Sequence, residues 1–240
     1  MEFDFPEQGF LQKIRELCTK HGAIYILDEM ITGFRLAYPG AHKMLGVEPD
    51  MTTWGKGVAN GFSLCVLAGK REIMRLGGID HTDRERVFLI STTHGAETHT
   101  VAAGLATLRE TKRTDSVARN SKTGLALRKG FEEVIKNRSL QSFVKMKGHE
   151  NWQLLQFFDH DKKLCDGYKT LVFQEFVKHG VLFRGMLVPT ISHSTTDVQK
   201  TIDTFDKVLG VYASALEART YKNHLVGAPV KPVFRKWNEA

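Results

Sequence analysis

Two short strand-like runs organise this chain, IYILDEMITGFR at residues 24–35 and DMTTWGKGVANGFSLCVLAG at residues 50–69. The first opens with four apolar residues and ends in Asp28-Glu29, which is typical of a strand buried on both faces with two carboxylates at its C-terminal end. The second opens with a similar β-favouring segment and reaches Lys56 between two glycines, and a third buried strand is predicted over residues 64–68. Ligands of open α/β sheets bind at the carboxyl ends of the strands. We therefore expect Asp28 and Lys56 at one edge of the same sheet.

An amine and a carboxylate at one sheet edge are the groups that pyridoxal phosphate requires. A lysine amine forms a Schiff base with a carbonyl, and pyridoxal phosphate is the commonest cofactor with such a carbonyl. A carboxylate beside the pyridine nitrogen keeps the ring protonated, so that the ring accepts electrons from a substrate carbanion. The spacing leaves a simpler interpretation open, in which Lys56 is a surface lysine in a turn and Asp28 caps the following segment.

Three segments carry a resemblance to a known family. They are LCTKHGAIYILDEMITGFR at residues 17–35, PDMTTWGKGVANG at residues 49–61 and STTHGAETHTVAAGLATL at residues 91–108. This pattern resembles the class III pyridoxal-phosphate aminotransferases, and within them the glutamate-1-semialdehyde 2,1-aminomutase-like branch. The resemblance implies an α/β protein of fold type I, with a partial large domain that has a mostly parallel sheet and a C-terminal α+β small domain.

The resemblance assigns roles to four residues. It makes Lys56 the Schiff-base lysine and Asp28 the partner of the pyridine nitrogen of pyridoxal 5'-phosphate. The threonine that contacts the cofactor phosphate of the neighbouring subunit falls on Thr92 or Thr93, depending on the end from which the motif is counted. A homodimer with shared active sites is implied, as are small-molecule amino donors and acceptors.

The resemblance leaves the exact reaction open. Class III enzymes carry a long stretch ahead of the Asp28 strand, with the phosphate turn, the ring-stacking aromatic residue and most substrate contacts. Only about twenty residues precede that strand here, so we expect the chain to correspond to the C-terminal part of such an enzyme. Transamination and an intramolecular amino shift are both open. The alternative is a truncated, non-catalytic relative that binds a partner or dimerises.

The resemblance also implies the domain organisation. It makes residues 1–112 part of the cofactor-binding domain and residues 113–220 the small domain, and we expect residues 221–240 to be an irregular tail. Apolar spacing predicts five helices, at residues 7–21, 97–111, 116–137 (the linker helix), 167–178 and 196–217. Residues 195–197 should cap the last of them. A hairpin is predicted at 143–158, with its turn at 148–151, and a strand at 181–183.

Composition excludes several other classes of protein. The net charge of +7 is spread along the 240 residues without a nucleic-acid-binding motif, so we expect no nucleic-acid partner. No apolar run is long enough for a transmembrane helix, and the acidic start MEFDFPEQGF has no signal-peptide character. Three widely spaced cysteines fit a reducing compartment and show no metal-binding spacing. We therefore predict a cytoplasmic protein without a metal site.

Overall fold

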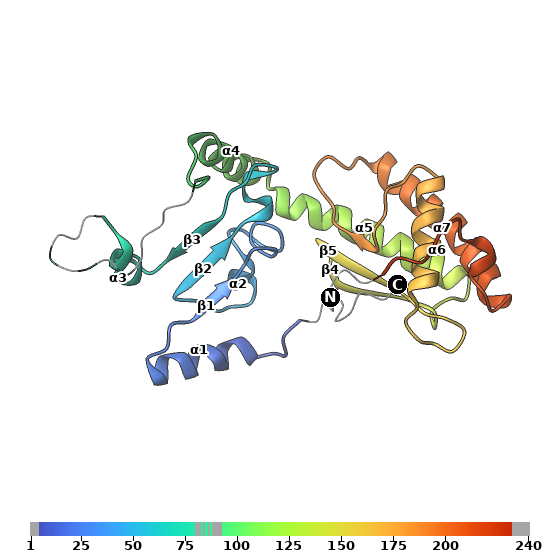
Figure 1. Ribbon diagram of the computed structural model, residues 1–240, viewed down its shortest axis with the longest axis horizontal. Helices are drawn as coiled ribbons and strands as arrows, with labels where there is room; N and C mark the ends of the chain where they lie inside the picture. Colours follow the sequence, from blue (N-terminus) through green and yellow to red (C-terminus); the bar gives the residue numbers. More distant parts are fainter. Residues whose placement is uncertain (1–4, 80–82, 84, 86, 88–92, 232–240) are drawn as a thin grey trace. The chain divides into compact units, whose positions relative to one another are not determined.

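The fold is given by a computed structural model that describes residues 5–79, 83, 85, 87 and 93–231 (Figure 1). Contacts along the chain define two compact units, Phe5–Ala118 and Arg119–Ala240. The division falls six residues beyond the boundary predicted at 112, inside helix α5 (Ser116–Asn137), which has the bounds that the sequence predicts for a helix.

The first unit combines a small sheet with short helices. Its elements in chain order are α1 (Phe10–His21), β1 (Ile26–Asp28), α2 (Ala41–Met44), β2 (Met51–Trp54), the 3-10 turn η1 (Lys56–Ala59), β3 (Val66–Gly69), α3 (Arg71–Met74), the 3-10 turn η2 (Arg75–Gly77) and α4 (Thr98–Thr114). Helix α1 ends where Gly22 adopts a left-handed conformation and its N–H bonds back to the last helical turn.

The sheet of this unit has the order β1-β2-β3. Strands β1 and β2 are parallel, and Asp28 is in register with Thr53. Strand β3 runs antiparallel to β2. The parallel pairing that the sequence predicts is therefore present between β1 and β2, whereas β3 reverses direction.

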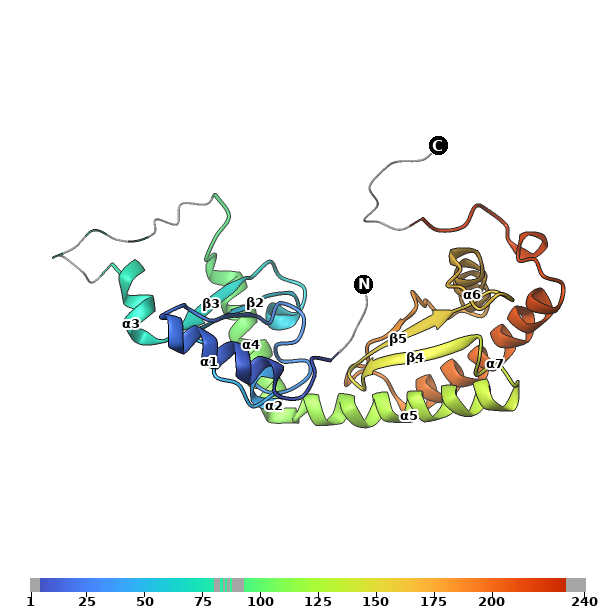
Figure 2. The ribbon, with the colours of Figure 1, turned by 90° about the horizontal axis from the view of Figure 1, so that it is seen from below.

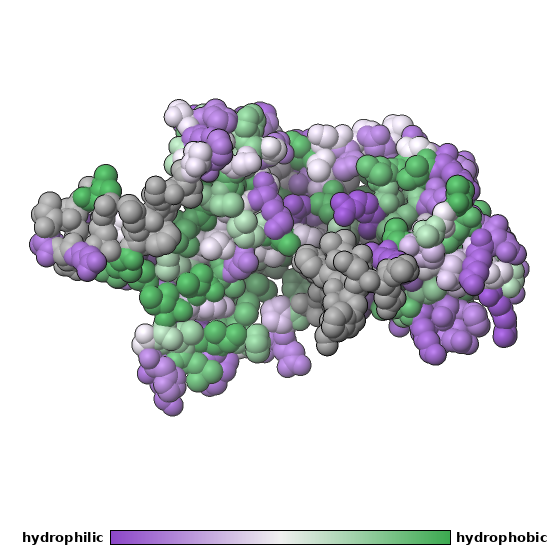
Figure 3. Space-filling view, viewed as in Figure 1, coloured by the Kyte–Doolittle hydropathy of each residue, from purple (hydrophilic) through white to green (hydrophobic). Residues whose placement is uncertain are grey.

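The predicted burial of the outer strands is wrong. Ile26 of β1 is 54% exposed and Leu67 of β3 is 49% exposed, while Tyr25 is buried. Figure 3 shows hydrophobic side chains gathered over β1–β3 and α1 on this face of the unit. A run of three or four apolar residues predicts a strand but does not tell how many of its faces other elements cover.

The second unit is a hairpin packed with three long helices. After α5 come β4 (Val144–His149), β5 (Trp152–Phe157), α6 (Asp166–Lys178), β6 (Met186–Leu187), α7 (Thr195–Glu217) and the 3-10 turn η3 (Lys222–His224). The sheet is antiparallel with the order β4-β5-β6, and the hairpin closes where His149 pairs with Trp152, as predicted. Figure 2 shows α5 running alongside this hairpin.

Aromatic stacking joins the three helices in the core of the second unit. The Phe131 ring of α5 lies 3.9 Å from the Phe205 ring of α7, which in turn lies 5.9 Å from the Phe176 ring of α6. All three side chains are fully buried. A Cβ on Gly130 would lie 2.3 Å from the Ile202 side chain, so glycine allows α5 and α7 to approach closely.

Two local predictions in the second unit need correction. The strand predicted at 181–183 is not formed, and the strand of this region is Met186–Leu187, whose residues pair with Leu154 and Gln153 of β5. Helix α7 is capped by Ser194, one residue before the predicted cap. Its side chain accepts a hydrogen bond from the Asp197 N–H, and the Asp197 side chain accepts one from the Ser194 N–H.

Candidate active site at the sheet edge

Asp28 and Lys56 follow neighbouring parallel strands. Asp28 is the last residue of β1, and Lys56 comes two residues after β2 ends at Trp54. Because the two strands run in the same direction, both residues belong to the carboxyl end of the sheet. This placement agrees with the sequence prediction, which rests on the strand ends alone.

The Asp28 carboxylate is held through one of its two oxygens. Its Oδ1 accepts a hydrogen bond from the Met30 backbone N–H at 2.9 Å and from the Thr53 hydroxyl at 3.0 Å. Within the described part of the chain, Oδ2 receives no hydrogen bond, and the side chain is exposed. The carboxylate therefore has a fixed orientation and one oxygen open to a donor.

Lys56 lies in an exposed turn just after β2. Its side chain is exposed and forms no ion pair or hydrogen bond with the described residues. Its backbone has a left-handed φ of 48°, which is uncommon for a residue with a Cβ. A Cβ on Gly55 would lie 2.3 Å from the Met30 Cε, so the turn before the lysine closes tightly on the residue that bonds to Asp28.

A buried carboxylate supports the loop behind Asp28. Glu29 is 1% exposed and accepts hydrogen bonds from the backbone N–H groups of Ala41 and His42, at 2.7 and 2.8 Å. The Thr32 hydroxyl donates to it at 2.9 Å and the His42 Nδ1 lies 2.8 Å away, which places the proton on Nδ1. Glu29 thus closes the loop between β1 and α2.

A second carboxylate anchors the opposite end of the strands. Asp50, just before β2, accepts hydrogen bonds from the Tyr25 N–H at 2.7 Å and from Arg15 at 2.6 Å, and Lys70 lies 2.7 Å away. The Lys70 ammonium and the Tyr25 N–H hold the pKa of Asp50 well below its usual range. The sequence motif places Glu29 beside Asp28 but predicts no partner for it, and no sequence pattern singles out Asp50 or Thr53, because their partners are set by the fold.

The predicted phosphate contacts are only partly described. Thr92 lies outside the described residues, and Thr93 is exposed, ahead of α4. Thr93 forms no hydrogen bond with Asp28 or Lys56 among the described residues. Helix α4 packs against the segment that follows Lys56. A Cβ on Gly104 of this helix would lie 2.6 Å from Leu64 and 3.8 Å from the Val58 carbonyl oxygen.

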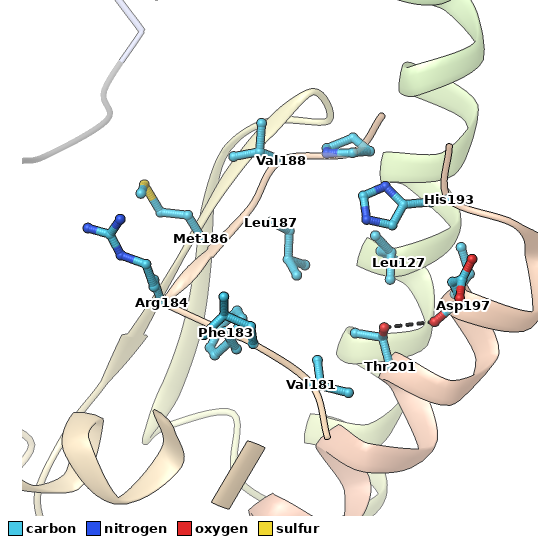
Figure 4. Close-up of a pocket in the computed structure, with 13 residues that line it drawn as sticks. Leu127, Val181, Phe183, Arg184, Met186, Leu187, Val188, His193, Asp197 and Thr201 are labelled. Atoms are coloured by element: carbon cyan, nitrogen blue, oxygen red, sulfur yellow. Dashed lines mark hydrogen bonds between the residues drawn. The ribbon is translucent and has the colours of Figure 1, made fainter. Parts of the chain in front are cut away.

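A separate cavity of about 300 Å³ lies within the second unit (Figure 4). Its wall is mainly apolar and includes Leu127, Phe183 and Leu187. The His193 ring points into the cavity, and the Arg184 guanidinium points away from it. The His193 Nδ1 lies 3.0 Å from the Thr190 N–H and accepts its hydrogen bond.

Two other kinds of site find no support in the described residues. No group of three or more histidine, cysteine, aspartate or glutamate side chains there is arranged to hold a metal ion. None of the helices in that part of the chain is long and apolar enough to cross a membrane.

Comparison with known sequences decides the family. The family model described as Aminotransferase class-III matches residues 2–209, which is most of the chain. The chain belongs to the class-III aminotransferase family. This membership confirms the resemblance drawn from the motifs around Asp28 and Lys56.

Individual relatives of this class-III family member agree. The chain is 35% identical over 184 residues to glutamate-1-semialdehyde 2,1-aminomutase of Clostridium tetani strain Massachusetts / E88, covering 74% of this chain and 40% of the relative. It is 30% identical over 229 residues to the protein of the same name from Legionella pneumophila strain Lens, covering 90% and 51%. The chain thus spans about half the length of the curated relatives it matches.

A solved structure shares the fold. The FumI protein of Sphingopyxis sp. MTA144, solved in its PLP internal aldimine form, matches with a TM-score of 0.76 at 24% identity, over 89% of this chain and 48% of that one. The likeness confirms the predicted fold type I over the matched residues.

Proposed function

We propose that this chain carries the cofactor-holding lysine and aspartate of a pyridoxal-phosphate enzyme that transfers amino groups. The reaction is transamination or an intramolecular amino shift on a small amino- or carbonyl-bearing molecule. The parallel pairing of β1 and β2 carries the proposal, because it brings an exposed Lys56 side chain and an oriented Asp28 carboxylate to one end of the sheet. The names of the two relatives and of the FumI structure support the same chemistry.

The donor set at the sheet edge fits this cofactor. The open Oδ2 of Asp28 would accept the N–H of a protonated pyridine ring, and the Lys56 amine would hold the aldehyde carbon. Thr92 or Thr93 would contact the phosphate of the partner subunit's cofactor. Pyridoxal phosphate supplies an electron-accepting ring that takes up the electron pair of a bond broken at the substrate α carbon.

The chain's own residues then have distinct tasks. Asp28 keeps a negative charge at the ring nitrogen, and two hydrogen bonds hold it in place. Lys56 takes and returns the proton at the substrate α carbon, a task that suits an amine on a four-carbon stem. The flanking Gly55 and Gly57 add no side chains beside that amine.

The setting of this activity is also part of the proposal. We infer a homodimer in the cytoplasm that shares its active sites between subunits and binds an amino donor and an acceptor. Family membership supports this, and the three cysteines are all free thiols.

Covalent trapping tests the assignment of Lys56. The full chain is incubated with pyridoxal phosphate, reduced with borohydride, and the modified peptide is mapped by mass spectrometry. We expect the label on Lys56, its loss in Lys56→Arg, and its retention in Lys70→Arg, since Lys70 is committed to Asp50. Asp28→Asn should retain the label but lower the amino-transfer rate, with about 100-fold as a rough expectation for loss of a charge partner.

Two results would contradict the proposal. A label that stays on another lysine in Lys56→Arg would remove Lys56 from the site. A folded wild-type chain that takes up no label would favour the non-catalytic, partner-binding alternative.

A further inference from the structure

Thr53 contacts both carboxylate-bearing residues at the end of β1. Its backbone carbonyl oxygen accepts the Glu29 N–H at 3.0 Å, as part of the sheet ladder. Its hydroxyl donates to the Asp28 Oδ1 at 3.0 Å. The side-chain bond exists because the parallel register sets Thr53 directly opposite Asp28.

The hydroxyl completes a two-point attachment of the carboxylate. The Met30 N–H reaches the same Oδ1 from the following residues of the chain, and Thr53 reaches it from the next strand. With the Met30 bond alone, the carboxylate could still rotate, because the terminal torsion of an aspartate has a broad energy profile. Two donors from different elements restrict that rotation and leave Oδ2 as the open acceptor.

We propose that Thr53 is a positioning residue that orients Asp28 toward the cofactor ring nitrogen. The inference rests on the proposed function in what Asp28 is oriented toward, but the Thr53–Asp28 coupling itself belongs to this chain alone. Without the hydroxyl, Oδ2 would spend less time in the direction of the ring nitrogen. Cofactor affinity would fall while Lys56 stays intact.

The neighbouring Thr52 provides a matched control. It has the same side chain on the same strand, but it is buried and lies opposite Leu27 instead of Asp28. Thr52→Val therefore makes the same chemical change beside the site without touching Asp28. Thr53→Ser keeps the hydroxyl at the site and should restore the wild-type behaviour lost in Thr53→Val.

The first measurement needs no cofactor. Amide hydrogen exchange is followed by NMR at Met30, whose N–H bonds to the Asp28 carboxylate, and at Glu29, whose N–H bonds to the Thr53 backbone. In Thr53→Val we expect Met30 to exchange roughly tenfold faster, as for loss of one hydrogen bond to a charged group, with Glu29 unchanged. Thr53→Ser and Thr52→Val should match the wild type. Equal acceleration at both amides, or no change at Met30, would overturn the proposal.

The second measurement adds pyridoxal phosphate. Thr53→Val should bind it roughly tenfold more weakly than wild type, Thr53→Ser and Thr52→Val should bind it normally, and the borohydride label should stay on Lys56 throughout. Equal affinities for wild type and Thr53→Val would overturn the positioning role. If the wild-type chain binds no pyridoxal phosphate, the proposed function fails, and the exchange data alone decide whether Thr53 orients Asp28.

Discussion

The two units of this chain differ in the interactions that stabilise the interior of each. Among the largest fully buried side chains of the described residues, those of the second unit are aromatic or aliphatic with the exception of Gln153, whereas the first unit contributes Glu29. The main hydrophobic cluster lies entirely in the second unit, from Leu127 to Leu216. Large apolar side chains are exposed in both units, but those of the first unit include the strand residues Ile26 and Leu67.

The comparison shows that hydrogen bonds and ion pairs of buried carboxylates stabilise the first unit, where hydrophobic packing stabilises the second. In the first unit, Glu29 closes the loop after β1 and Asp50 ties α1, β1 and the end of β3 together. Glu29 directly follows Asp28 at one end of the strands, and Asp50 lies at the other end. The second unit should therefore be most sensitive to loss of buried volume, and the first to loss of the carboxylates Glu29 and Asp50.

The largest expected effect comes from the aromatic stack of the second unit. Phe205→Ala removes a fully buried ring in contact with the rings of Phe131 and Phe176, and should lower the free energy of unfolding by about 3–5 kcal/mol. Leu182→Ala, at an exposed position, should change it by less than about 0.5 kcal/mol. Urea denaturation of the full chain measures both, and similar losses would contradict the packing account.

The second largest effect is expected from the buried carboxylate of Glu29 in the first unit. The Glu29 carboxylate accepts hydrogen bonds from two backbone N–H groups and from the Thr32 hydroxyl. Glu29→Gln keeps the shape of the side chain but replaces the carboxylate by a neutral amide, and should lower the free energy of unfolding by about 2 kcal/mol. Glu48→Gln is the matched control, because Glu48 is exposed and pairs with Lys43 on the surface. If both variants lose the same stability in urea denaturation, Glu29 is not an anchor.

A pH scan tests the anchoring role of Asp50 in the first unit. The pKa of Asp50 is depressed in the folded chain by Lys70 and the Tyr25 N–H, so its stabilisation is complete above the unfolded pKa and is lost as pH falls below about 4. Asp50→Asn should lower the free energy of unfolding by about 1–2 kcal/mol at neutral pH. On acidification, the variant should lose less stability than the wild type. Stability curves of the two proteins measured from pH 7 to pH 3 should therefore converge. Parallel curves would contradict this role.

The smallest expected effect is a gain in stability at the proposed catalytic lysine. Lys56→Gly relieves a left-handed backbone and should raise the free energy of unfolding by about 1 kcal/mol, while removing the amine that would hold the cofactor. Asn60 has a similar φ of 45°. Because asparagine tolerates this conformation, Asn60→Gly should raise the free energy of unfolding by only about a few tenths of a kcal/mol. Thermal denaturation of both variants checks the order, and a loss of stability in Lys56→Gly would show that the side chain contributes contacts.

Much of the fold could be predicted because it depends on local patterns. Apolar spacing placed the long helices α5, α6 and α7 within a residue or two, and the hairpin β4–β5 with its turn. The residues that end β1 and β2 placed Asp28 and Lys56 at one sheet edge. In each case the signal lies in a few consecutive residues, whose periodicity or termination is independent of the rest of the chain.

The tertiary structure alone decided which groups meet. The sequence could not tell that Ile26 and Leu67 remain exposed, that the last strand is Met186–Leu187, or that Thr53 and not Thr52 bonds to Asp28. Each of these depends on strand register and on which elements cover a face, and both are set by contacts between residues far apart in the chain. The sequence by itself determined the family and the position of Asp28 and Lys56 at the ends of two strands, whereas the register of β1 against β2 decided how Asp28 is held.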